Sequence, residues 1–201
     1  MQITAIKQQV KNPERASIFV DGKYSFSLSL NELVIEKLKI NHELNEAELK
    51  RLKKLSDDGK LKMRALEWTL SRPRSKRELR DYLYRKKTEP EQVEALTEEF
   101  TTRGYMSEQH YALWLSDMRR RQGKSERAIR SELSSKGITR EVADETLQEG
   151  KDELSRLQTI ISKKMKLPRY KADQQKLMQY LARQGFGYDD IKTVLRKITD
   201  T

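Results

Sequence analysis

A repeat with a period near fifty residues is the feature that most constrains the fold of this chain. In each of two copies a serine is followed by two apolar residues and a lysine, all at a constant offset of 50: Ser75, Leu79, Leu83, Lys86 and then Ser125, Ile129, Leu133, Lys136. A weaker third copy contains Leu177, Leu181, Gly185 and Phe186. Before and after each central stretch lies another stretch with apolar residues at helical spacing. The pattern therefore predicts three tandem three-helix units.

Ordinary helical heptads would also produce some chance matches at any period. The repeat interpretation is favoured because serine caps, two apolar positions and a terminal Lys or Gly recur in the same order. Ser75 with Glu78, and Thr88 with Glu91, fit a capping box at a helix start. We expect repeats at residues 60–105, 106–153 and 154–201.

The first 59 residues are different in kind. Residues 16–20 and 23–29 are β-prone runs joined by Asp21-Gly22, a dipeptide that supplies the positive φ angles of a two-residue hairpin turn. Residues 3–9 are a plausible third strand. Two helices should follow, the second opened by Asn45 with Glu48. The expected fold is mainly α, with a small N-terminal β-hairpin or sheet and a helical segment before the repeats.

The charge indicates a polyanionic partner. The chain has 35% hydrophobic and 36% charged residues and a net charge of +11, a balance that suits thin helix layers and favours nucleic acid or a nucleoprotein surface. The sign alternates along the chain: +8 over residues 60–88, −5 over 89–102, +5 over 103–140 and −5 over 141–155. Basic and acidic helices are therefore expected to alternate.

The residues for an enzyme are scarce. The chain has no Cys and two His, and neither His42 nor His110 has a carboxylate at metal-ligand spacing. The glycines are isolated, so there is no phosphate-binding loop. We therefore expect no catalytic site, no metal and no cofactor.

The expected location is the cytoplasm. The Met-Gln-Ile-Thr start lacks the charged and apolar regions of a signal peptide, and no apolar run approaches the length of a membrane span. A membrane-surface protein is disfavoured because the apolar stripes of the helices are needed for packing.

Basic residues recur at equivalent positions of the first two repeats. Arg74 matches Lys124, Arg77 matches Arg127, and Arg80 matches Arg130, each pair 50 residues apart. Stacked repeats would present such residues in register, as a stripe. The remaining candidates for partner or nucleic-acid binding are Arg72, Arg119, Arg120 and Arg121. The alternative is a solubilising face in which these cations are paired with Glu.

Five aromatic residues admit two interpretations. They could stack on the bases of single strands, but they lie at or near the apolar positions of their helices, so core packing is favoured. These residues are Trp68, Tyr82, Tyr105, Tyr111 and Trp114.

Several motifs in the right order resemble the RecX family of regulatory proteins over about residues 60–198. They are Arg72-Pro73-Arg74-Ser75 with Glu78-Leu79; Gly104-Tyr105, Tyr111-Ala112 and Trp114; Glu132-Leu133 with Lys136-Gly137-Ile138; and Lys176 with Tyr180-Leu181-Ala182-Arg183 and Gly185-Phe186. The chain departs from the family pattern at Lys86-Lys87-Thr88, where a Gly is usual, at Ser107-Glu108 and at Gln184. These departures bear on contact details and break no helix.

The resemblance implies tandem three-helix repeats that bind in the groove of the RecA–DNA filament, and we expect the protein to be a monomer. It also implies inhibition of the ATPase, strand-exchange and coprotease activities of RecA. Contact with the backbone of single- or double-stranded DNA is a further expectation. The competing hypothesis is a nucleic-acid-binding module that acts without RecA.

Overall fold

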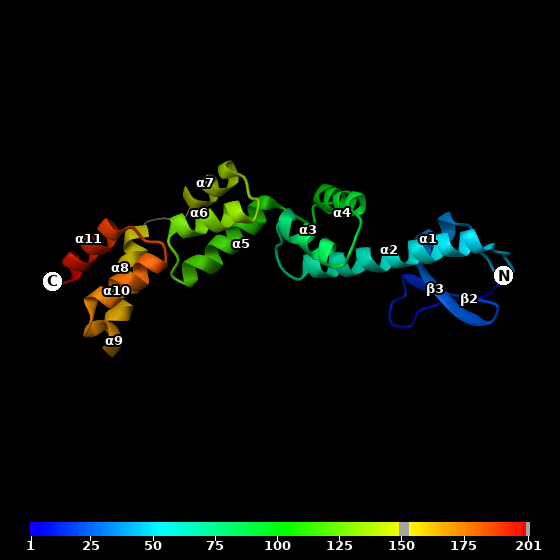
Figure 1. The fold of residues 1–201 in the computed structure, drawn as a ribbon, viewed down its shortest axis with the longest axis horizontal. Coiled ribbons are helices and arrows are strands. Elements are labelled where there is room, and N and C mark those ends of the chain that lie inside the picture. The colour runs from blue at the N-terminus through cyan, green and yellow to red at the C-terminus, as the bar shows by residue number, and fades with distance from the viewer. Residues whose placement is uncertain (149–152, 200–201) are drawn as a thin grey trace. The chain divides into compact units, whose positions relative to one another are not determined.

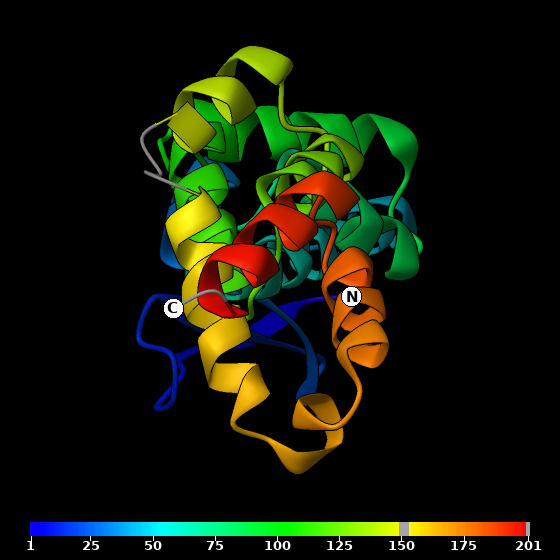
Figure 2. The ribbon, with the colours of Figure 1, turned by 90° about the vertical axis from the view of Figure 1, so that its left-hand side faces the viewer.

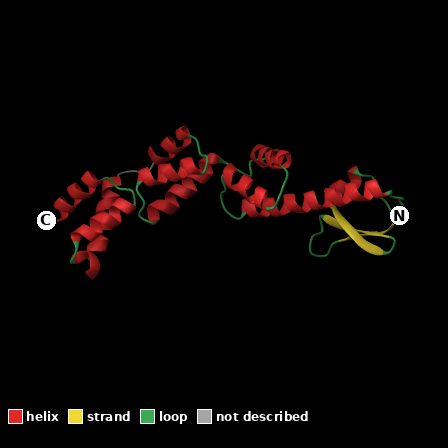
Figure 3. Cartoon of the chain, viewed as in Figure 1, coloured by secondary structure: helices red, strands yellow, loops and turns green. Residues whose placement is uncertain are grey.

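The computed structural model describes residues 1–148 and 153–199 and divides the chain into two compact units, Met1–Trp68 and Thr69–Thr201. Strands occur in the first unit, and the described part of the second is helical (Figure 3). The predicted fold class is confirmed.

The N-terminal unit is a three-stranded antiparallel sheet with helices beside it (Figure 1). The sheet order is β1 (Ile3–Gln8), β2 (Arg15–Val20) and β3 (Lys23–Ser29), followed by α1 (Leu30–Ile35) and α2 (Glu46–Leu70). Asp21 and Gly22 have φ angles of +47° and +79°, as a tight hairpin turn requires. The alternating inward side chains of the sheet form one core with α2: Ile3, Ile18, Val20, Phe26, Leu28, Leu44 and Leu52.

Helix α2 corrects one expectation. Two separate helices were expected around residues 45–55 and 61–70, but a single helix of 25 residues runs through both. Asn45 and Glu48 exchange the reciprocal hydrogen bonds of a capping box at its start. No proline interrupts it, and the single glycine, Gly59, costs a helix interior only about 1 kcal/mol. The expected boundary between residues 59 and 60 therefore lies inside a helix.

The helices of the second unit occur in the predicted order. The first repeat contains α3 (Lys76–Arg85) and α4 (Pro90–Thr102), and its expected first helix is the end of α2. The second contains α5 (Glu108–Arg121), α6 (Glu126–Ser135) and α7 (Arg140–Gln148). The third contains α8 (Glu153–Met165), α10 (Gln174–Arg183) and α11 (Tyr188–Thr199), with an additional single turn, α9 (Pro168–Lys171).

The central helices α3, α6 and α10 are equivalent in detail. Each is 10 residues long and is capped by a side chain, from Ser75, Ser125 or Asp173, that accepts a hydrogen bond from a backbone N–H of the first turn. The fourth and eighth residues of each helix are fully buried: Leu79 and Leu83, Ile129 and Leu133, Leu177 and Leu181. The same hydrophobic stripe is thus used three times.

The end of each central helix also follows one rule. The residue after the C-cap is Lys87, Gly137 or Gly185, and all three have a positive φ. Such a turn favours glycine. Lys87, where the first repeat lacks the usual Gly, adopts φ +60° all the same, so the departure changes the residue but not the turn.

The start of α4 corrects a second expectation. Thr88 was expected to cap this helix with Glu91, but the N-cap is Glu89, without a side-chain hydrogen bond, and Pro90 occupies the first turn. Proline is favoured there because its φ is already helical and its missing N–H would have had no helical partner.

Each of the last two repeats has its own apolar core. The core of the second contains Tyr111, Leu115, Ile129, Leu133, Ala143 and Leu147. In the third, α8, α10 and α11 pack together (Figure 2). Their buried residues are Leu157, Ile161, Leu177, Leu181, Ile191 and Leu195. In the first, the buried residues of α3 and α4 are Leu79, Leu83, Val93, Leu96 and Phe100.

Candidate functional site

Arg80 and Arg130, two candidates for partner binding, are ion-paired within their own repeats. Arg80 donates two hydrogen bonds to Glu94 of α4, at 2.8 and 2.7 Å, and Arg130 donates one to Asp144 of α7, at 2.9 Å. Both the arginines and their acidic partners are 50 residues apart. These contacts lower the pKa of Glu94 and raise that of Arg80. At these two positions the cations are therefore paired with acidic side chains, and each pair joins a central helix to the acidic third helix.

Arg72 and Arg119 are also engaged. Arg72 donates to both carboxylate oxygens of Glu78, at 3.1 and 3.0 Å, and its guanidinium lies 4.7 Å from the ring centre of Trp114. Arg119 donates to both oxygens of Glu132, at 2.7 and 2.5 Å, and the pair raises the pKa of Arg119. The contact of Arg72 with Trp114 joins the first repeat to the second, and the pair of Arg119 with Glu132 joins α5 to α6.

Glu78 is a focus of these contacts. Its carboxylate accepts from the backbone of Ser75 and lies 3.7 Å from the Lys136 ammonium. Burial acts to raise the pKa of Glu78, but the hydrogen bonds from Arg72 and the nearby cations outweigh it, so the pKa is lowered. Glu78 therefore remains ionised and connects α3 to the end of α6.

Arg77 and Arg127 face corresponding junctions between repeats. A Cβ atom added to Gly137 would lie 3.7 Å from the Cβ of Arg77, and Arg127 donates a 3.1 Å hydrogen bond to the carbonyl oxygen of Gly185. Both glycines follow a central helix. Both arginines are exposed, and Arg77 makes no ion pair or hydrogen bond within the described residues. The equivalence predicted for this pair extends to their surroundings.

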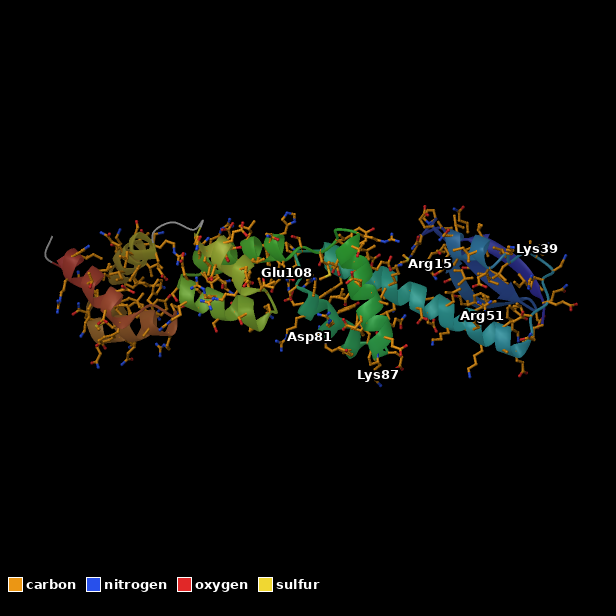
Figure 4. The ribbon with its side chains drawn as sticks, turned by 90° about the horizontal axis from the view of Figure 1, so that it is seen from above. Arg15, Lys39, Arg51, Asp81, Lys87 and Glu108 are labelled. Atoms are coloured by element: carbon orange, nitrogen blue, oxygen red, sulfur yellow. The ribbon has the colours of Figure 1, made fainter. Side chains whose placement is uncertain are left out.

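A further contact joins α3 to the start of α5. The Lys76 ammonium lies 3.6 Å from the carboxylate of Glu108, which is labelled in Figure 4. Arg74, in the preceding loop, is half-buried and donates to Ser71, and burial lowers its pKa.

The remaining candidates surround the α5–α6 loop. Arg120 is largely buried and donates to Glu126 and to the backbone of Leu147, both at 3.4 Å. Arg121 is exposed, and neither it nor the side chain of Lys124 has a polar partner among the residues described. Arg120 and Arg121 line a cleft of about 760 Å³ between this loop, α8 and Tyr180 of α10.

Three further cations of this cleft, Arg156, Lys163 and Lys164, were not among the candidates. A signal for them exists in the sequence, because residues 156, 160, 163 and 164 fall on one face of a helix. An offset of 50 does not reveal them, since the third repeat carries different residues there.

The aromatic residues favour packing over base stacking, most clearly at Tyr111. Its side chain is 1% exposed and packs against Trp114 with ring centres 5.7 Å apart. Burial and the neighbouring Glu78 raise the pKa of Tyr111 to about 12. Trp114 is covered by Arg72, and Tyr105 packs edge-on against Phe100.

Metal sites and membrane spans are both absent from residues 1–148 and 153–199. These residues contain no group of three or more His, Cys, Asp or Glu side chains that could hold a metal ion. No helix among them is long and apolar enough to cross a bilayer.

Comparisons with known proteins agree with the repeat architecture. Family models described as the RecX N-terminal domain, the second RecX three-helix domain and the third match residues 1–45, 107–147 and 151–195. A regulatory protein RecX from Listeria welshimeri is 30% identical over 207 residues, covering 100% of this chain and 77% of the relative. The chain belongs to the RecX family. The regulatory protein RecX of Bacillus velezensis is 32% identical, covering 97% of this chain and 76% of its own.

Solved RecX structures share the fold. A crystal structure of regulatory protein RecX superposes with a TM-score of 0.71 at 23% identity, covering 97% of this chain and 98% of the other. The RecX structure from Lactobacillus salivarius gives 0.59 at 24% identity, covering 72% and 98%. The N-terminal segment, over residues 1–45, matches the family's N-terminal domain.

Proposed function

We propose that this protein regulates the RecA recombinase by binding along the groove of the RecA–DNA filament as a monomer in the cytoplasm. The observation that carries the proposal is family membership over the whole chain, since the RecX resemblance implies RecA as the partner. Bound there, the protein slows ATP hydrolysis, strand exchange and coprotease activity by hindering the movements that the filament needs.

The charges that remain unneutralised support a polyanionic or nucleoprotein partner. Seven of the ten candidate cations donate to carboxylates or to backbone and side-chain oxygens inside the protein: Arg72, Arg74, Arg80, Arg119, Arg120, Arg127 and Arg130. Arg77, Arg121 and the Lys124 side chain have no such partner within the described ranges, so they can bind an external anion without breaking an internal contact. The partner surface therefore includes fewer cations than the candidates predicted from the sequence.

The experiment is a DNA-dependent ATPase assay of a cognate RecA filament over a range from sub-stoichiometric to stoichiometric protein. The expected result is a graded fall in hydrolysis, with a parallel fall in strand exchange. An unchanged ATPase rate and unchanged strand exchange over the same range would contradict the proposal.

The second candidate is a nucleic-acid-binding module that acts without RecA, and the basic cleft beside α8 favours it. DNA affinity that falls steeply with salt and is the same without RecA, together with no effect on the ATPase, would select this function.

A further inference from the structure

The described residues that line the cleft between the α5–α6 loop and α8 include several basic side chains and no acidic ones. Its charged lining residues are Arg120, Arg121, Arg156, Lys163 and Lys164, and no Asp or Glu of residues 1–148 and 153–199 lines it. Thr159 adds a hydroxyl, while Ile160 and Tyr180 supply apolar surface. Five positive charges around one hollow create a strong local field for an anion.

The wall of the cleft contains guanidinium donors without acceptors. Arg156 donates through one nitrogen to the Lys124 carbonyl at 2.8 Å, whereas its Nε and Nη1 atoms are buried without a hydrogen-bond partner, as is the Nε of Arg120. Burial lowers the pKa of Arg156 and the adjacent Arg120 lowers it further. Unmet buried donors are costly, and an anion can relieve that cost by its field or, after a small side-chain shift, by direct contact.

Two described carboxylates, those of Glu126 and Glu153, lie close to these arginines. Glu126 accepts from Arg120 at 3.4 Å, and Glu153 accepts from the backbone N–H of Glu126 at 2.8 Å. Each therefore has a partner of its own. The two cations of the rim, Arg121 and Lys163, are exposed and make no polar contact within the described residues.

The corresponding junction between the first and second repeats differs from this cleft, because its Arg72 is paired with a carboxylate. Aligning the buried pair Tyr111 and Leu115 with Leu157 and Ile161 places Ile160 at the position of Trp114. The offset of 50 places Gln122 and Ala128 at the positions of Arg72 and Glu78. At the first junction Arg72 covers Trp114 and is held by Glu78, leaving a hollow of about 230 Å³. At the second, Gln122 and Ala128 cannot form such a pair, and no other described residues form one at these positions.

We propose that this cleft binds phosphate groups of a nucleic-acid backbone, held by Arg120, Arg121, Arg156, Lys163 and Lys164. A backbone is favoured over a single free phosphate because the basic face continues along α8 into a second hollow lined by Lys163 and Lys166. Guanidinium and ammonium donors at a groove are the usual partners of phosphate oxygens. Figure 2 shows α8 beside α10, the two helices of the third repeat that contribute to the cleft. The proposal does not depend on RecA.

The test uses the full chain without RecA and a fluorescent single-stranded oligonucleotide, with binding followed by anisotropy over a salt series. The double variant R121Q/K163Q removes two exposed cleft cations. The matched control is R85Q/K87Q, which removes two exposed cations of the first repeat that have no polar partner among the described residues; Lys87 is labelled in Figure 4. Circular dichroism and thermal melting check that both variants fold, and the single variants R121Q and K163Q replace the double if it does not.

The cleft variant should bind about tenfold more weakly, and its dependence of log K on log salt should be shallower by about one unit for each phosphate that it no longer binds. The control should keep its affinity within about twofold. Equal losses in both variants, or none in either, would overturn the proposal.

Two competitors identify the ligand source. If tripolyphosphate stabilises the parent protein but not the cleft variant while both bind the oligonucleotide equally, free polyphosphate is the ligand and the nucleic-acid assignment is wrong. If polyglutamate of matched charge competes as well as unlabelled oligonucleotide, the cleft accepts acidic protein segments and the phosphate assignment is wrong. If tripolyphosphate and polyglutamate each compete only weakly with the labelled oligonucleotide, the proposal is supported. The ATPase assay with RecA tests the proposed function separately.

Discussion

Single residues at the junctions between repeats carry constraints that composition does not reveal. Gly185 has φ +101°, and a Cβ atom there would lie 2.7 Å from the Cβ of Ala128 and clash with the hydroxyl of Ser125. The backbone N–H of Ser125 donates to the carbonyl of Gln184 at 3.0 Å. The end of α10 therefore approaches the first turn of α6 more closely than any side chain permits.

The variant Gly185→Ala should lower the melting temperature of the protein more than Gly104→Ala does. Gly104 has φ +73° but open space around its Cβ position, so its replacement costs the strained backbone alone, about 1 kcal/mol. Gly185→Ala adds the steric clash and should cost at least about twice as much. Thermal and urea unfolding of the two variants measure the difference, and equal costs would show that the close approach is relieved without penalty.

Glu78 makes part of the folding stability dependent on pH. Its pKa in the folded state is lowered, so its stabilising contribution is complete above its unfolded pKa, near 4.5, and is lost as the pH falls through the lower folded value. Glu78→Gln should therefore reduce stability at pH 7 and flatten its decline between about pH 5 and pH 3. Urea midpoints measured across this range, for parent and variant, test the sign. A variant whose decline is as steep as the parent's would mean that other carboxylates carry it.

At the scale of helices, the alternation of basic and acidic elements has a structural use. The pairs Arg80–Glu94 and Arg130–Asp144 each join a central helix to the third helix of the same repeat. The same net charges could have been read as a partner surface or as paired, solvated charge. At these two positions the cations are paired with acidic side chains.

The charge-reversal variant Arg80→Glu should lower the melting temperature by about 2 °C, because an exposed attractive pair becomes a repulsive one. Adding Glu94→Arg should restore most of the loss, since the two charges then attract again. Melting curves at low and high salt provide the check, with the effect decreasing as salt screens the pair. Failure of the second change to compensate would show that Arg80 stabilises α3 through other contacts.

Local chemistry explains which elements were predictable from sequence. The hairpin at Asp21-Gly22, the caps at Ser75 and Asn45, and the buried pair Leu79 and Leu83 depend on residues close in the chain. The continuity of α2 was missed because the apolar residues on either side of the expected boundary, between residues 59 and 60, were assigned to two separate helices. The partners of the arginines were missed because 14 residues separate Arg80 from Glu94, and their contact depends on how the two helices pack.

For the molecule as a whole, the net charge of +11 overstates the surface available to a partner. Many cations are held internally, while Arg77 and Arg127 remain exposed at equivalent junctions. The four repeated arginines of the central helices therefore separate into two classes. Arg80 and Arg130 are ion-paired with the third helix of their own repeat, whereas Arg77 and Arg127 are exposed and form no ion pair among the described residues, Arg127 donating to the backbone carbonyl of Gly185.

Two double variants should therefore affect different properties. R77A/R127A should weaken binding to the RecA filament, and the salt dependence should become shallower by about one unit for each phosphate that these arginines bind in the parent protein. Its melting temperature should change little, because exposed substitutions usually shift stability by about 0.5 kcal/mol or less, although the variant cannot form the Arg127 bond to Gly185.

R80A/R130A removes the same number of charges and should show the converse, a lower melting temperature with filament binding nearly unchanged. Co-sedimentation with filaments over a salt series, beside thermal unfolding of each free variant, measures both properties. The comparison controls for net charge, so a difference in binding must come from position. If both pairs weaken binding equally, the filament responds to overall charge, and the distinction between the two classes fails.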